Sequence, residues 1–161
     1  MNKVIIIGCP GAGKSTFSKA LKEKTGLPLF HLDMLFWNND KTHVDREVFD
    51  KKLSDVLELD NWIIDGNYKR TLEMRLKACD TVFLLDFPVE DCISGVNARI
   101  GKQRSDMPWV EQNFDEDFKQ WIIDFPNNEL PYIYSLLKVY SDKKIIVFKS
   151  HKEIDNYIKT I

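Results

Sequence analysis

The stretch Gly8-Cys9-Pro10-Gly11-Ala12-Gly13-Lys14-Ser15-Thr16 decides how the rest of the chain is interpreted. It fits the pattern G-x-x-x-x-G-K-[ST], in which a glycine-rich loop wraps around phosphate groups. Such a loop aims several backbone N–H groups at one point, and Gly8, Gly11 and Gly13 leave room because they carry no Cβ atom. The helix that follows turns its free N–H groups and its positive dipole end toward the anion. The stretch therefore predicts a site for a nucleoside triphosphate.

The residues of this loop have distinct expected roles. Contacts to the nucleotide are expected from Gly8, Pro10, Gly11, Ala12, Gly13, Lys14, Ser15 and Thr16. We expect Lys14 to reach the β- and γ-phosphates as a catalytic group, and the Ser15 hydroxyl to bind Mg²⁺. An apolar, β-branched run at residues 3–7 predicts a buried parallel strand before the loop, and apolar residues at helical spacing follow it. An ordinary glycine-rich turn is the alternative, and the fixed positions with these flanks argue against it.

The composition limits the class of protein to which the chain can belong. The chain has 161 residues, 43% apolar content and a net charge of −2, which predict one globular domain over residues 1–161. No basic block appears, so a nucleic-acid surface is not expected. The three cysteines lack metal-like spacing, and Cys9 is either a loop filler or a thiol with a pKa lowered by the helix. No leader or membrane span is apparent, so we expect a cytoplasmic monomer or dimer.

Strands and helices alternate along the predicted fold. Besides residues 3–7, strands are predicted at residues 27–32, 62–64, 81–85 and 144–148. Helices are predicted near residues 17–24, 45–59, 69–78, 89–100, 114–125, 129–140 and from 151 to the end, with Pro126 ending one of them. This alternation predicts an α/β sandwich around a five-stranded parallel sheet, with the site at the carboxyl ends of the strands.

Three carboxylates follow predicted strands. Asp65 comes after a buried apolar strand and before Gly66, so we expect it to hold Mg²⁺ together with Ser15. Asp86 is a competing candidate that lacks the glycine turn. Asp33 can bind a substrate hydroxyl, accept its proton or serve in the outer Mg²⁺ shell, and a helix cap or turn is the alternative.

Cationic residues appear in two segments. The helix at residues 69–78 carries Lys69, Arg70 and Arg75, which are either a solvated face or, for Arg70, a contact to an anionic substrate. The segment near residues 100–113 is basic and broken by Gly and Pro, which is typical of a mobile lid over phosphates. A solvated surface loop is the alternative for this segment.

Taken with these elements, the chain resembles the adenylate-kinase-related P-loop kinases, and in particular the group called DNA topology modulation, or FlaR-like, proteins. The resemblance spans nearly the whole chain and rests on residues 8–16, 31–33, 62–68 with Thr71, 85–88, 104–107 and 121–126. Its most specific part, Asp65-Gly66-Asn67-Tyr68, is similar to the Asp-Gly-Phe-Pro-Arg turn of adenylate kinases, whose Arg grips the acceptor phosphate. The resemblance implies that Gly66, Asn67, Tyr68 and Arg70, with Asp33 and Asp65, contact the substrate.

The resemblance also implies a nucleoside-kinase-like three-layer α/β/α fold with strand order 2-3-1-4-5. It implies that Arg99 and Arg104 are catalytic lid cations and that residues 150–152 lie beside the adenine. Two departures are visible. The turn after Asp65 lacks Phe-Pro, which argues against AMP as acceptor, and Gly95 stands where another basic residue is expected, which thins the lid's positive surface.

We therefore expect a kinase that transfers the γ-phosphoryl group of Mg·ATP to a small acceptor such as a nucleoside or nucleotide. Lys14, Asp33, Arg99 and Arg104 are its expected catalytic residues. With a hydroxyl acceptor Asp33 would be a general base, whereas with a phosphate acceptor Arg70 would matter more. The alternatives are a nucleotide-dependent regulatory or DNA-topology protein and a simple ATPase.

Overall fold

The computed structural model describes residues 1–161 and is organised around a sheet of parallel strands. The strands are β1 (Lys3–Gly8), β2 (Leu29–His31), β3 (Trp62–Asp65), β4 (Thr81–Leu85) and β5 (Lys144–Phe148). Their order is β2-β3-β1-β4-β5, so the predicted strand order and the all-parallel pairing are confirmed. Strand β1 is central, with Ile5 paired to Ile64 on one side and to Val82 on the other.

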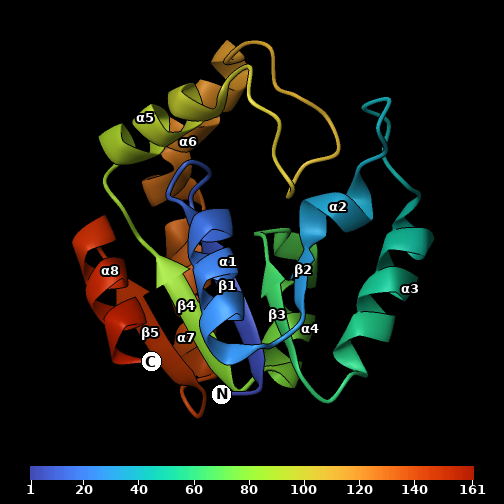
Figure 1. Cartoon of the computed structure of the whole chain (residues 1–161), viewed down its shortest axis with the longest axis vertical. Coiled ribbons are helices and arrows are strands. Elements are labelled where there is room, and N and C mark those ends of the chain that lie inside the picture. Colours follow the sequence, from blue (N-terminus) through green and yellow to red (C-terminus); the bar gives the residue numbers. More distant parts are fainter.

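Helices cover both faces of this sheet. They are α1 (Lys14–Thr25), α2 (Leu32–Phe36), α3 (Arg46–Leu57), α4 (Lys69–Ala78), α5 (Val89–Arg99), α6 (Glu116–Asn128), α7 (Leu130–Val139) and α8 (His151–Thr160). Figure 1 shows α1 and α8 in front of the sheet and α4 and α7 behind it, which makes the predicted three layers. Helices α5 and α6 rise beyond the carboxyl ends of the strands, and the segment that joins them reaches toward α2 (Figure 1). None of the helices is long and apolar enough to cross a membrane.

The core explains why the strands are continuous apolar runs. Residues 4–7 of β1 and residues 62–64 of β3 are fully buried, because helices pack on both faces of a parallel sheet. From α1, Phe17 packs edge-on against Phe83 of β4, with ring centroids 4.9 Å apart. The core thereby fixes the carboxyl ends of β1 and β3, from which the site is built.

Two sequence-based boundaries were wrong. Strand β2 spans Leu29–His31 instead of residues 27–32, and Asp33, which follows it as expected, lies in the first turn of the short helix α2. Pro126 does not end its helix but lies inside α6, which continues to Asn128. Because proline has no N–H, α6 loses the hydrogen bond to the Ile122 carbonyl, and the helix ends two residues later.

Candidate active site

A cavity of about 610 Å³ opens at the carboxyl ends of β1, β2 and β3. Its walls are the phosphate loop, helix α2, the turn after β3 and the segment at residues 100–115 that joins α5 to α6. Ligands bind at this edge in open α/β sheets, and the volume suits a small substrate beside a triphosphate. Of the sequence-predicted residues, Pro10, Lys14, Ser15, Asp33, Asp65, Gly66, Asn67, Tyr68, Arg99 and Arg104 line it.

The phosphate loop has the geometry expected of an anion cradle. Gly8, Gly11 and Gly13 all have positive φ values, and Gly13 directly precedes α1. The Lys14 ammonium folds back over the loop, with Nζ 2.9 Å from the Gly8 carbonyl oxygen and 3.2 Å from that of Cys9. The loop thus presents an ammonium group and the amino end of a helix to the cavity.

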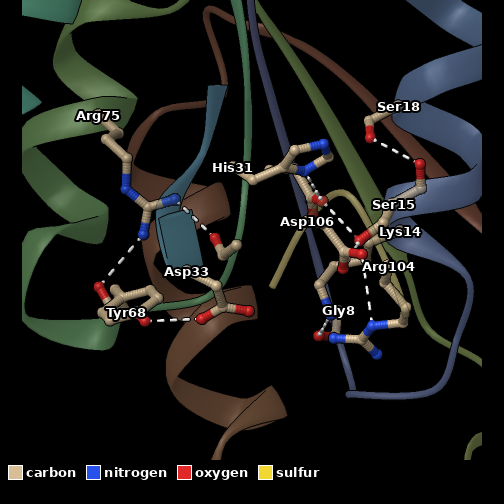
Figure 2. Close-up of polar contacts among 12 residues, drawn as sticks. Gly8, Lys14, Ser15, Ser18, His31, Asp33, Tyr68, Arg75, Arg104 and Asp106 are labelled. Atoms are coloured by element: carbon tan, nitrogen blue, oxygen red, sulfur yellow. Dashed lines mark hydrogen bonds and ion pairs between the residues drawn. The ribbon is translucent and has the colours of Figure 1, made fainter. Parts of the chain in front are cut away.

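Beside the loop, one oxygen-rich cluster gathers residues from four segments. The Ser15 Oγ atom lies 2.7 Å from Asp106 Oδ2 (Figure 2). It also lies 2.9 Å from Asp65 Oδ2, and His31 Nδ1 lies 2.9 Å from the same Asp65 oxygen. Asp65 and Asp106 are 4% and 6% exposed, so water does little to screen their charges. Burial alone would raise the pKa of Asp106, but the Ser15 hydroxyl and the Arg104 guanidinium outweigh it and hold that pKa below its usual value.

The chemistry of this cluster fits Mg²⁺. The Ser15 hydroxyl has one hydrogen, yet its oxygen contacts carboxylate oxygens of both Asp65 and Asp106. A hard divalent cation with oxygen ligands would balance two facing carboxylates and a hydroxyl oxygen. Ser15 and Asp65 are the ligands expected from the sequence, and Asp106 lies beside them as a further candidate. Asp86 is elsewhere, bound by Lys149 and by the Tyr134 hydroxyl at 2.6 Å.

Asp33 occupies a separate part of the cavity. The Tyr68 hydroxyl donates a 2.7 Å hydrogen bond to Asp33 Oδ1 (Figure 2). Burial raises the pKa of Asp33 above its usual value, and the bond from Tyr68 offsets part of this rise. The carboxylate is therefore held in a fixed position with an elevated proton affinity, as a general base requires.

The turn after β3 is braced by the protein itself. The Asn67 side chain clamps Gly8: its Oδ1 accepts from the Gly8 N–H at 3.0 Å, and its Nδ2 donates to the Gly8 carbonyl at 2.7 Å. Arg75 is fully buried and donates to the backbone carbonyls of Gly66, Asn67 and Tyr68. The oxygen and the nitrogen of the Asn67 side-chain amide are thus both engaged with Gly8, so this residue positions the phosphate loop.

The two arginines of α4 depart from the sequence-based expectations in opposite ways. Arg75 is no solvated surface residue; burial lowers its pKa to about 9, which leaves the guanidinium charged at pH 7. Arg70 does not line the cavity and instead pairs with Asp50 of α3 through both guanidinium NH₂ groups. The cause is helical spacing, because the buried residues of α4 include Thr71 and Arg75, and Arg70 lies on another side of the helix.

The lid segment also differs from expectation, because its cations carry their own counterions. Arg99 Nε lies 2.7 Å from a Glu111 carboxylate oxygen, and Arg104 lies 3.4 Å from Asp106 and 3.5 Å from Glu111. The two guanidinium groups are thus neutralised by two carboxylates within the same segment. Both arginines do line the cavity beside Lys14, as a lid requires.

Helix α5 touches the phosphate loop through bare backbone. A Cβ atom on Gly95 would lie 2.0 Å from the Gly11 carbonyl oxygen, and one on Gly11 would lie 1.9 Å from that of Cys92. Gly95 is therefore a packing position and not a missing basic residue. The adjacent Cys92 thiol and burial raise the pKa of Cys9, which favours the loop filler over the alternative of a thiol with a lowered pKa.

A second hollow, of about 360 Å³, lies on the outer side of the loop. It is lined by Gly13, Thr16 and His151, among others, and places the start of α8 beside the phosphate loop. Thr16 faces this hollow rather than the main cavity. The predicted proximity of residues 150–152 to the nucleotide site is consistent with this arrangement.

Sequence reasoning assigned no role to His31, Asp106 or Glu111. His31 pairs in register with Asp65 on the neighbouring strand, and that adjacency follows only from the strand order. Asp106 is 91 residues from Ser15 in the chain, in a segment without regular structure, so no periodic pattern could have placed it. The run at residues 104–107, on which the family resemblance partly rests, was the only sequence signal for Asp106.

Comparisons with known proteins show which kinases this chain is similar to. No family model matches the chain. It is 31% identical over 88 residues to the adenylate kinases of Thermotoga neapolitana and Thermotoga maritima, which is 53% of this chain and 39% of those proteins. The match thus spans well under half the length of these relatives.

Solved structures with a similar fold extend over the whole chain. A shikimate kinase from Bacteroides thetaiotaomicron has a TM-score of 0.63 at 18% identity, covering 98% of this chain and 94% of that one. A shikimate kinase from Aquifex aeolicus has a TM-score of 0.53 at 19% identity, with 98% and 92% covered. The chain therefore has the fold of P-loop kinases and is related to adenylate kinase over about half its length.

Proposed function

We propose that the protein is an Mg·ATP-dependent phosphotransferase that acts on a small molecule. The observation that carries this proposal is the meeting of Ser15, Asp65 and Asp106 beside a phosphate loop, in a cavity that also holds a separate carboxylate, Asp33. A site that only bound a nucleotide would not need a carboxylate such as Asp33, which lies apart from Ser15, Asp65 and Asp106. The resemblance to the FlaR-like group and the relation to adenylate kinase both support a kinase.

Each residue has a defined task in this proposal. Lys14 and the loop amides hold the β- and γ-phosphates, and Lys14 stabilises the charge that develops on the transferring group. Ser15, Asp65 and Asp106 hold Mg²⁺, which supplies charge neutralisation to the phosphates. The lid segment excludes water from the phosphoryl group. The nucleotide base lies near the start of α8, beside the hollow lined by His151.

The test is Mg²⁺-dependent ATP binding, measured by calorimetry, for the wild type and Ser15→Ala. We expect Mg²⁺ to tighten ATP binding to the wild type, and to do so much less in Ser15→Ala because a metal ligand is lost. Ser94→Ala, an exposed serine on α5, is the matched control and should behave as wild type. Equal Mg²⁺ dependence in Ser15→Ala and the control would contradict the metal assignment.

The alternative is a nucleotide-dependent regulatory or DNA-topology protein without turnover. It predicts ATP binding without transfer to any acceptor, together with DNA affinity that falls steeply with salt. The net charge of −2 and the absence of a basic run give this alternative no structural support.

A further inference from the structure

The part of the cavity around Asp33 is walled by aromatic rings; we call it the acceptor end. The Phe36 ring meets Trp37 and Tyr68 edge-on, with centroids 5.0 and 5.2 Å apart. From the lid segment, Trp109 meets Trp37 at 5.9 Å. All four rings line the cavity, and such walls bind flat, weakly polar groups better than charged ones.

No free guanidinium group is available to a phosphate at the acceptor end, because Arg99 and Arg104, which line the same cavity, are paired with Glu111 and Asp106. Arg70 lies outside the cavity on Asp50, and Arg75 is sealed in the core by backbone carbonyls. The remaining cation here, Lys41, lies 5.4 Å from the centre of the Trp109 ring. A phosphate ester would bring its negative charges next to Asp33 without the bidentate partner that usually receives them.

One polar atom of Asp33 is left for a ligand. Tyr68 occupies Asp33 Oδ1, whereas Asp33 Oδ2 accepts no hydrogen bond from the protein. The Trp109 indole N–H is buried and is not presented to a ligand. A free carboxylate oxygen in an aromatic cavity matches a molecule that has a hydroxyl group attached to a flat ring.

We infer that the phosphoryl acceptor is an uncharged alcohol attached to a flat ring, the chemistry of a nucleoside, and that Asp33 Oδ2 takes the proton of its hydroxyl group. This inference rests on the proposed phosphotransferase function. The hydroxyl oxygen forms a bond to the γ-phosphorus as its proton passes to Asp33, and the bond from the γ-phosphorus to the bridging oxygen breaks. ADP leaves with that electron pair, the product is a phosphate monoester, and Asp33 returns its proton to water.

The experiment measures transfer of labelled γ-phosphate from Mg·ATP to matched acceptors: nucleosides, their 5′-monophosphates and ring-free polyols. We expect transfer to nucleosides and little to the other two classes. Asp33→Asn should reduce transfer about 10²–10⁴-fold, the usual contribution of a general base, with ATP affinity unchanged. Arg70→Ala is the control, and transfer should stay within about twofold because Arg70 lies outside the cavity.

Binding is followed separately through tryptophan fluorescence in the presence of Mg·ADP, because Trp37 and Trp109 line the acceptor end. Faster transfer to monophosphates than to nucleosides, or a larger loss in Arg70→Ala than in Asp33→Asn, overturns the inference and leaves the kinase standing. Transfer to the polyols alone refutes the flat ring. Binding of ATP with no transfer to any class refutes the kinase itself, and the inference falls with it.

Discussion

The two ends of the cavity are built in different ways. At the phosphate end, one continuous stretch supplies the backbone, the ammonium group of Lys14 and the hydroxyl group of Ser15. At the acceptor end, Asp33, Tyr68 and Trp109 come from α2, from the turn before α4 and from the lid segment. The phosphate loop is thus a local structure formed by one strand and one helix, to which Asp65 and Asp106 are added from other segments. The acceptor end exists only once the whole fold has formed, so it is the end at which related chains can change acceptor.

Of the three substitutions compared below, the one at the phosphate end should have the largest effect. Lys14→Ala removes the ammonium group that faces the transferring phosphoryl group, and should lower kcat about 10²–10³-fold. Thermal unfolding should be nearly unchanged, because Lys14 bonds only to loop carbonyls. Turnover is the measurement, with the exposed Lys22→Ala on the same helix as control. Unaltered turnover in Lys14→Ala would refute the assignment of this residue.

The second substitution removes a side chain that supports the acceptor end but does not line the cavity. Arg75→Met leaves the carbonyls of Gly66 and Asn67 without their donor, whereas the Tyr68 carbonyl keeps its bonds from Thr71, and the change should reduce the free energy of unfolding in urea by about 2–4 kcal/mol. On the same helix, Arg70→Ala loses only an exposed ion pair and should cost less than about 1 kcal/mol. Similar reductions of the free energy of unfolding in the two variants would show that Arg75 does not stabilise the turn after β3.

The smallest effect concerns pH at the acceptor end. A hydrogen bond donated to a carboxylate favours its charged form, so Tyr68→Phe should raise the pKa of Asp33 further above its usual value. A base works only when ionised, so the acid limb of the pH–rate profile should move to higher pH in Tyr68→Phe. The control is Tyr140→Phe, whose hydroxyl bonds Glu73 outside the cavity. An unmoved limb would mean that Asp33 does not accept the proton.

The contrast between the ends also decides what sequence alone could predict. The phosphate loop, the apolar strands and the placing of Asp65 at the end of one of them followed from contiguous patterns, because a buried parallel strand and a phosphate loop each leave a local signature. The strand order came from the family resemblance. The directions of Arg70 and Arg75 could not be predicted, because a charged residue facing the core violates the usual preference, and Arg75 is accommodated here by backbone carbonyls of the turn that precedes α4.

The lid segment was predictable in position but not in charge. Its basic residues suggested free cations, yet Glu111 pairs with both Arg99 and Arg104. Glu111 is seven residues beyond Arg104 in an irregular segment, so no helical or strand periodicity could relate the two. Pairings of this kind depend on the path of the backbone, which composition does not determine.

The contact between Gly11 and Gly95 limits which residues homologous proteins can carry at these two positions. Because each position meets the other segment's backbone, adding even one methyl group at either residue forces α5 away from the phosphate loop. A compensating substitution at the partner cannot help, since no side chain smaller than hydrogen exists. As a lineage diverges and its acceptor changes, these two glycines should persist together, and a homologue that lacks one should have moved α5 rather than found another residue pair.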